Sequence, residues 1–171
     1  MVEINLGAGR KRLNRSIGLD AVRTSACDVQ VNLDGEALPF KSHSIDRVYA
    51  YHVLEHIREL PTMMEEIHRV CNKGGEVHIE VPYYTCVGAF GDPTHVRFFT
   101  YNTFLFWTQN TEQANWFSKA RYTIVRRYML FGRVHRLMGI SFLANRFPNI
   151  YENFFAFIFP ARFLQVVLAT V

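Results

Sequence analysis

The spacing of apolar residues changes along the chain and marks the expected strands and helices. Short apolar runs at residues 2–6, 16–19, 28–33 and 45–51 are typical of strands, and the last run is nearly continuous, as in a strand buried on both faces. From Pro61 the spacing becomes helical up to Cys71, and Gly74-Gly75 predicts the end of that helix. Residues 76–81 alternate as a fifth strand, which Pro82 ends.

The second half of the chain continues with mixed patterns. Residues 100–107 have helical spacing, residues 121–127 alternate like a sixth strand, and residues 163–171 form a seventh apolar run. One or two helices are expected in residues 129–158. Strands and turns that repeat around an intervening helix predict an α/β protein with a mostly parallel, doubly wound sheet. Only ten residues separate Gly9 from Asp20, so the first helix is expected to be short or absent.

Composition narrows the class of protein. The chain has 171 residues, of which 49% are hydrophobic and 20% charged, which excludes a disordered chain. No apolar run is long enough for a membrane span, and Met1 leads straight into a strand-like segment rather than a secretory signal. The three cysteines, an odd number without metal-type spacing, favour a reduced, cytoplasmic protein.

Charge is divided unevenly along the sequence. Residues 1–112 carry 11 basic and 14 acidic side chains, whereas residues 113–171 carry 8 basic side chains and one acidic residue, Glu152. Of the 25 aromatic residues, 19 lie at or after Phe98. A basic, aromatic half of this kind is typical of a surface for an anionic partner.

Several motifs follow one another in a recognisable order. They are Ile4-Asn5-Leu6-Gly7-Ala8-Gly9, Asp20, the segment from Asp34 to Phe40 with Leu38-Pro39-Phe40, the segment from Asp46 to His56 with Val53-Leu54-Glu55-His56, and Asn72-Lys73-Gly74-Gly75. In this order they resemble the class I S-adenosylmethionine-dependent methyltransferases, most closely the small "type 11" group. The resemblance covers about residues 2–100. It implies a Rossmann-like sheet of seven strands with an antiparallel last strand.

The resemblance also implies a cofactor site with S-adenosyl-L-methionine as donor and S-adenosyl-L-homocysteine as product. Glycines in the first loop allow the backbone to approach a ligand closely, and an acidic residue after the second strand suits ribose hydroxyls. The Asp34 segment is expected to line the adenine, and the end of the fourth strand to face the methionine. The predicted cofactor-binding residues are Asn5, Gly7, Ala8, Gly9, Asp20, Asp34, Gly35, Glu36, Ala37, Tyr51, His52 and His56.

The acceptor site of such enzymes usually follows the fifth strand. There the segment Asp92-Pro93-Thr94-His95 is similar to one in relatives that methylate sugars and other small or glycan-linked acceptors. Histidine is suited to proton removal at neutral pH, so His95, with Asp92, is the predicted catalytic pair for a hydroxyl acceptor. The same Asp-Pro pair is also a turn signal. Tyr83, Tyr84 and Arg97 are predicted to bind substrate, and no resident metal is expected.

The chain is thus read as a single methyltransferase domain, with a cofactor half (1–82) and an acceptor half (83–171) that carries a helical lid insertion at about 129–158. In that insertion the apolar positions keep near-helical spacing beside Arg133, His135 and Arg136. A lid with solvated arginines is the favoured interpretation, peripheral membrane or lipid-linked substrate contact is the second, and nucleic acid is disfavoured because no RNA-binding motif accompanies the basic residues. The oligomeric state is left open.

Two other functions stay open at this point. His52-Val53-Leu54-Glu55-His56 matches H-x-x-E-H, in which two histidines on one face of a helix share a zinc ion and the glutamate acts as base. A degenerate module that binds the cofactor and regulates a partner without transferring methyl groups is the other alternative, because the loop after Gly9 is short.

Overall fold

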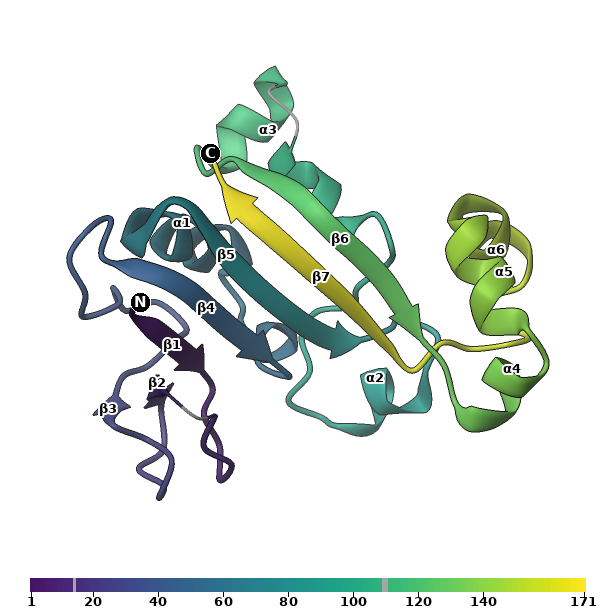
Figure 1. Cartoon of the computed structure of the whole chain (residues 1–171), viewed down its shortest axis with the longest axis horizontal. Coiled ribbons are helices and arrows are strands. Elements are labelled where there is room, and N and C mark those ends of the chain that lie inside the picture. Colours follow the sequence, from purple (N-terminus) through teal and green to yellow (C-terminus); the bar gives the residue numbers. More distant parts are fainter. Residues whose placement is uncertain (14, 109–110) are drawn as a thin grey trace.

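The computed structural model describes residues 1–13, 15–108 and 111–171. Seven strands form one sheet in the order β3-β2-β1-β4-β5-β7-β6 (Figure 1). They are β1 (Glu3–Leu6), β2 (Ser16–Asp20), β3 (Val29–Gln30), β4 (Ile45–Tyr51), β5 (Cys71–Pro82), β6 (Tyr122–Leu130) and β7 (Phe163–Thr170). Strands β1 to β5 pair in parallel, and β7 lies antiparallel between β5 and β6. This topology confirms the predicted α/β class with its antiparallel last strand.

The strand order places a crevice at one edge of the sheet. From β1 the chain proceeds outward to β2 and β3, and then returns to the other side of β1 with β4 and β5. In open α/β sheets ligands bind outside the carboxyl ends of the strands at such a reversal. The loops after β1, β2, β3 and β4 therefore meet where a ligand is expected.

Helix α1 (Leu60–Val70) covers one face of the sheet and fixes the loop after β3. Its apolar side is buried, including Met64 and Ile67. At its last turn the Arg69 guanidinium donates to the carbonyl oxygens of Phe40 (2.9 Å) and Leu38 (3.0 Å), and Glu66 accepts from the Leu38 amide (3.0 Å). The Leu38-Pro39-Phe40 motif is thus tied to the helix that packs on the sheet.

The other face of the sheet carries polar side chains. Arg47 on β4 bridges Glu3 on β1 (3.1 Å) and Glu76 on β5 (3.2 Å). Within the described ranges, no helix connects β1 to β2 or β2 to β3. In Figure 1, helix α1 lies behind the sheet, and α3 (Glu112–Phe117) lies beyond the edge of the sheet near the C-terminus. The short connection predicted after Gly9 therefore leaves this face without the helical cover of a fully wound sheet.

Several predicted boundaries are wrong. Helix α1 ends at Val70, because Cys71 already pairs with Ile45 in the sheet, and the turn at Gly74 (φ 77°) lies inside β5. The third strand is reduced to β3. Residues 100–107 contain only the 3₁₀ helix η2 (Thr103–Thr108), and residues 129 and 130 belong to β6 rather than to the helical insertion.

The insertion forms three short helices instead of one or two. Helices α4 (Arg133–Leu137), α5 (Ile140–Arg146) and α6 (Pro148–Phe154) lie beyond the adjoining ends of β6 and β7 (Figure 1). Leu137 and Met138 are exposed, whereas Val134, with Arg133 and His135, contributes to the lining of a cavity between α4 and the segment after β5. The lid interpretation stays a prediction. None of the helices in the described ranges is both long and apolar enough to span a bilayer.

Candidate active site

The loop after β1 approaches the crevice in a conformation that requires glycine. Gly7 and Gly9 have φ values of 63° and 55°, in the left-handed region. A Cβ atom on Gly7 would lie 2.7 Å from Cγ2 of Val53, so the loop also passes directly over the segment that follows β4. The Asp20 carboxylate holds the loop by accepting from the Gly9 amide (2.8 Å), while its second oxygen accepts from the Val22 amide (2.9 Å).

A cavity of about 390 Å³ opens at this point. It lies at the carboxyl ends of β1, β2 and β4, as the strand order requires. Because a carboxylate has about four acceptor sites, Asp20 keeps lone pairs for a ligand beyond the two amide bonds it accepts. The cavity is lined by Gly7, Gly9, Asp20, Ala21, Asn32, Leu33, Asp34, His52, Val53, His56 and Ile57.

The segment after β3 contributes one side of this cavity. Asp34 lines the cavity, and its Oδ1 accepts from the amides of Arg58 (2.9 Å) and Glu59 (3.1 Å) just before α1. Glu36 folds back onto the Asn32 amide (3.0 Å). Six of the predicted cofactor residues are not among those that line the cavity. Asn5 and Ala8 are buried, Gly35, Glu36 and Ala37 are exposed, and the sixth is Tyr51.

His52 brings positive charge to the cavity. It has a φ of 54° and its Nε2 lies 2.9 Å from Oε1 of Glu80. The side chain of Glu55, ahead of that of Glu80, raises the pKa of His52 to about 9 against the opposing effect of burial. The imidazole is therefore a cation at neutral pH and suits a ligand carboxylate. Tyr51, in contrast, is not part of the lining, and its ring packs against Tyr49 on the open face of the sheet (5.7 Å between centroids).

A second hollow of about 460 Å³ adjoins the first and is lined in part by Pro93 and Thr94 of the predicted acceptor segment, but not by the predicted catalytic residues Asp92 and His95. His56 lines both hollows, and its ring meets the ring of His95 edge-on at 4.7 Å. Nε2 of His95 lies 4.0 Å from Oδ2 of Asp92. The Thr94 side chain and amide hold the pKa of Asp92 below its usual value. The second hollow is lined by Asn32, Asp34, His56, Arg58, Pro93, Thr94 and Val96.

The three predicted substrate-binding residues have structural contacts. Tyr83 is fully buried and donates from its hydroxyl to Glu152 (2.8 Å). Tyr84 packs against the Phe157 ring (5.6 Å). The Arg97 guanidinium donates to the backbone carbonyl of Ile57 (3.3 Å) and to that of Arg58. These residues were predicted to bind substrate because they follow the fifth strand. Their position in the sequence does not reveal the partners that they contact in the fold.

The helix that the H-x-x-E-H alternative needs is absent from this segment. Residues 54–56 form the single 3₁₀ turn η1 (Leu54–His56), and His52 lies before it in the left-handed conformation, bound to Glu80. His52 and His56 are therefore not one turn apart on an α-helix. The premise of the zinc-hydrolase alternative is wrong.

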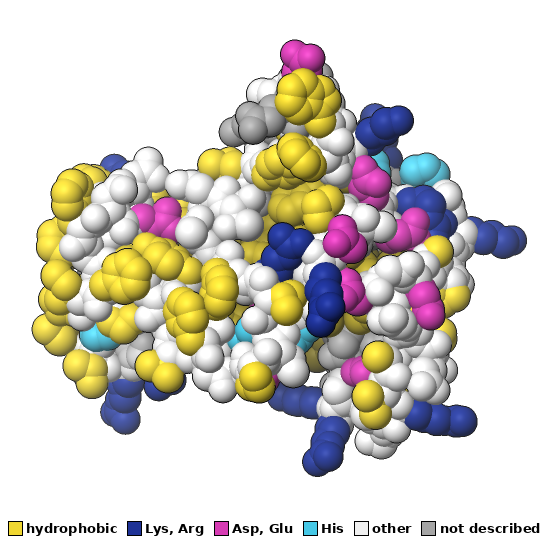
Figure 2. Space-filling model, turned by 180° about the vertical axis from the view of Figure 1, so that it is seen from behind, with side chains coloured by type: hydrophobic (Ala, Val, Ile, Leu, Met, Phe, Trp, Pro, Cys, Tyr) yellow, Lys and Arg dark blue, Asp and Glu magenta, His cyan; other side chains and the backbone are white. Residues whose placement is uncertain are grey.

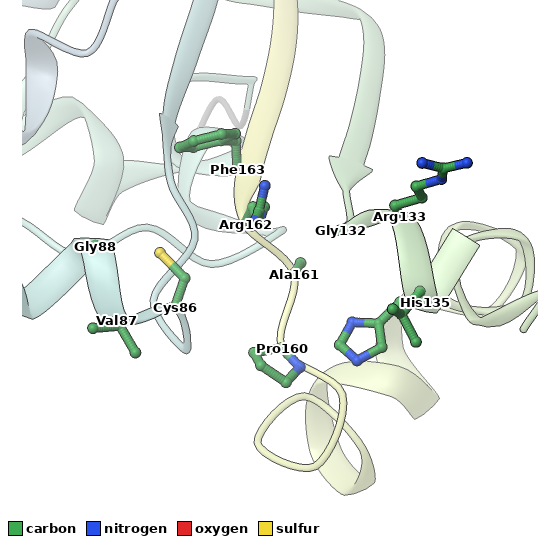
Figure 3. Close-up of a pocket in the computed structure, with 11 residues that line it drawn as sticks. Cys86, Val87, Gly88, Gly132, Arg133, His135, Pro160, Ala161, Arg162 and Phe163 are labelled. Atoms are coloured by element: carbon green, nitrogen blue, oxygen red, sulfur yellow. The ribbon is translucent and has the colours of Figure 1, made fainter. Parts of the chain in front are cut away.

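A third, largely apolar cavity of about 660 Å³ separates α2 (Val87–Gly91) from α4. Figure 3 shows Cys86 and Val87 on one side, His135 on the other, and the chain from Pro160 to Phe163 between them. The Phe163 ring also meets the His52 ring edge-on at 5.0 Å. This cavity thus neighbours the cofactor cavity on the side of the three C-terminal helices.

Comparison with known proteins agrees with this architecture. The family model described as "Methyltransferase domain" matches residues 10–79. Together with the fold, this match supports a class I methyltransferase that depends on S-adenosylmethionine. No curated protein matches the sequence.

Solved structures share the fold along almost the whole methyltransferase chain. A SAM-dependent methyltransferase from Archaeoglobus fulgidus is 17% identical, with a TM-score of 0.64 over 98% of this chain and 85% of that one. One from Mesorhizobium loti is 14% identical, with a TM-score of 0.57 over 98% and 90%. Geranyl diphosphate C-methyltransferase from Streptomyces coelicolor, solved with Mg²⁺, geranyl diphosphate and S-adenosyl-L-homocysteine, is 12% identical, with a TM-score of 0.62 over 99% and 72%. At these identities the likeness concerns the fold.

Three residues that contribute to these cavities were not predicted as site residues from the sequence. Val53 supports the glycine loop, Asn32 lines both hollows, and Thr94 links His56 to Asp92 through its hydroxyl (2.9 and 2.6 Å). Thr94 stands inside the Asp92–His95 segment, so a search for hydroxyls between the two catalytic candidates could have found it. The individual cofactor and catalytic assignments stay predictions.

Proposed function

We propose that this methyltransferase transfers a methyl group to a hydroxyl of a glycan- or lipid-linked acceptor at an anionic membrane surface. The transferase class follows from the family. The acceptor class is supported by one observation above all, the exposed apolar and basic surface of α4–α6 beside the active-site cavities.

That surface is unusually apolar for one exposed to water. Figure 2 shows hydrophobic side chains gathered over the region of α4–α6. Phe142 and Phe154 are each 71% exposed and Leu137 is 79% exposed. Large apolar patches on a folded protein mark interaction or membrane sites. The exposed apolar residues of this surface are Val134, Leu137, Met138, Phe142, Leu143, Phe147, Ile150, Phe154, Phe155, Phe157 and Ile158.

Its charge favours an anionic partner. Arg133, Arg136 and Arg146 are exposed on these helices. The one carboxylate of residues 113–171, Glu152, is engaged by the Tyr83 hydroxyl (2.8 Å) and the Tyr101 amide (2.6 Å). A basic helix with aromatic and aliphatic side chains lies in the interface of a bilayer, and each basic residue gains roughly 1 kcal/mol near anionic lipids.

The proposed reaction needs in-line geometry and a path for one proton. The acceptor oxygen attacks the methyl carbon, the carbon–sulfur bond breaks, and its electron pair stays on sulfur to give S-adenosyl-L-homocysteine. The hydroxyl proton leaves toward the cluster formed by His56 and His95. Holding donor and acceptor in line is worth roughly 7–11 kcal/mol, so the two adjoining hollows supply most of the catalysis.

The proposal is tested by measuring the transfer of tritium from labelled S-adenosylmethionine to two acceptor preparations. One consists of anionic vesicles that carry an extracted membrane fraction, and the other is the aqueous fraction. Label in the lipid-phase product is expected. Flotation with anionic vesicles should be lost in the double variant Phe142→Ser, Phe154→Ser and kept in Trp116→Ser, which alters an equally exposed aromatic residue outside the surface. Label in RNA or in water-soluble acceptors alone contradicts the acceptor class. Cofactor binding without any transfer favours a regulatory module.

A further inference from the structure

Three potential metal ligands converge between the cofactor cavity and the acceptor hollow. Glu55 and His56 come from η1, and His95 comes from the loop after α2. One ligand atom from each of these side chains lies within 4.8 Å of the others. Residues from two distant parts of the chain thus meet beside the proposed site of methyl transfer.

One oxygen of the buried Glu55 carboxylate lacks a hydrogen-bond partner. The residue is 1% exposed, and its Oε1 lies 3.6 Å from Nδ1 of His52. Its Oε2 is buried and has no hydrogen-bond partner among the described residues. His52 faces the other oxygen, and a buried oxygen left without a hydrogen bond or a metal is costly. The free oxygen therefore points to a ligand.

Both imidazoles are held so that Nε2 is the nitrogen with a lone pair. Nδ1 of His95 lies 3.1 Å from the Ala89 carbonyl oxygen, which can only accept, so this nitrogen carries the proton. Nδ1 of His56 lies 2.9 Å from the Thr94 hydroxyl, whose own hydrogen goes to Asp92 (2.6 Å). Metal-bound histidines donate their second nitrogen to a carbonyl or a carboxylate network in this way.

We propose that Glu55, His56 and His95 bind a divalent transition-metal cation. Two imidazoles and a carboxylate favour Zn²⁺, Mn²⁺ or Fe²⁺ over Mg²⁺ and Ca²⁺, which prefer oxygen ligands alone. Three protein ligands leave coordination positions open, and His56 borders the hollow proposed for the acceptor.

The role of the cation, unlike its binding, rests on the proposed function. With the cation bound, His56 and His95 are its ligands and no longer take the proton of the acceptor. The cation lowers the pKa of a bound hydroxyl instead, so the acceptor oxygen loses its proton to solvent and attacks as an alkoxide. His95 then acts through the metal as a ligand rather than as a free base. The reaction remains a transfer of CH₃ from sulfur to oxygen with one proton released.

Metal titration of chelator-stripped protein tests the site directly. Calorimetry with Zn²⁺ and with Mn²⁺ should show one site per chain, and Co²⁺ should give the visible absorption of a nitrogen- and oxygen-ligated ion. His56→Gln, His95→Gln and Glu55→Gln should each abolish that site. Thr94→Val should weaken it by roughly 10- to 100-fold, because it removes the group that orients His56.

His78→Gln is the matched control. His78 forms a pair with Glu76 (2.8 Å) on β5, so this variant tests whether a histidine–carboxylate pair elsewhere in the protein is enough to bind the metal. The site is refuted if stoichiometric metal binding survives all three ligand variants or if His78→Gln removes it. It is also refuted if the folded parent protein binds no metal. Binding of S-adenosyl-L-homocysteine in the same samples separates the two proposals, since a protein that binds it but no metal refutes only the metal site.

Discussion

Replacing Gly7 by alanine tests how the glycine loop is built into the cofactor cavity. At a φ of 63° an L-residue costs roughly 1–2 kcal/mol. The new Cβ would also lie 2.7 Å from Cγ2 and 2.8 Å from Cβ of Val53, and overpacking of this kind adds about 1–3 kcal/mol. Gly7→Ala should therefore destabilise the protein by about 2–5 kcal/mol. Since about 1 kcal/mol corresponds to roughly 2–4 °C for a chain of this size, a loss of 3 kcal/mol lowers Tm by roughly 6–12 °C.

Two other glycines separate the backbone cost from the clash. Gly139 has a φ of 75° with nothing within 4 Å of the added Cβ, and Gly9 has a φ of 55° with its nearest neighbour at 3.9 Å. Alanine at either position should cost only the backbone term of about 1–2 kcal/mol. Urea unfolding of the three variants measures the difference. Gly7→Ala no more destabilising than Gly139→Ala would refute the predicted contact with Val53.

Val53→Ala supplies the complementary test of the same contact. It removes the methyl groups nearest to Gly7 but leaves Cβ, which is also 2.8 Å away, so it should restore only part of the stability lost in Gly7→Ala. Because Val53 and Gly7 both line the cavity, Gly7→Ala should also displace Val53 and weaken binding of S-adenosyl-L-homocysteine, as calorimetry can show. A full rescue by Val53→Ala contradicts the geometry.

Three further changes have expected outcomes. Glu152→Gln should lower the free energy of unfolding by about 2 kcal/mol in urea, because the Tyr83 hydroxyl loses a charged acceptor; an unchanged midpoint contradicts this anchor. Burial holds the pKa of His68 below its ordinary value, so the unfolded chain binds the proton more readily and stability should fall as the pH drops below about 6.5; His68→Gln should flatten this dependence, and an identical pH profile refutes it. Asp34→Ala should cost about 1 kcal/mol through the amides it binds before α1, and an unaltered melting curve argues against that role.

The sequence predicted which residues meet at the cavity better than it predicted what each one contacts. Gly7, Asp20, Asp34 and His52 come together because each follows a strand whose carboxyl end lies at the same edge, which strand order alone decides. The role of Tyr83 could not be predicted in this way, since its hydroxyl is bound by Glu152, 69 residues further along the chain.

The helical segments show a second limit of the sequence patterns. Periodicity identified an apolar side in the α4 region, but Leu137 and Met138 are exposed, because spacing does not reveal whether that side faces the protein or the solvent. The end of α1 was misplaced for a related reason. Cys71 fits the helical period, yet its pairing with Ile45 takes it into the sheet.

Calorimetric titration of the pure protein with S-adenosyl-L-homocysteine tests the cofactor cavity most directly. Binding of one molecule per chain is predicted. Asp20→Ala should weaken it by roughly 10- to 100-fold, since each hydrogen bond to a charged group is worth about 1.5–3 kcal/mol. Asp92→Ala, in the predicted acceptor segment, should leave the affinity unchanged. No binding by the folded parent protein, or equal loss in both variants, contradicts the assignment of this cavity to the methyl donor.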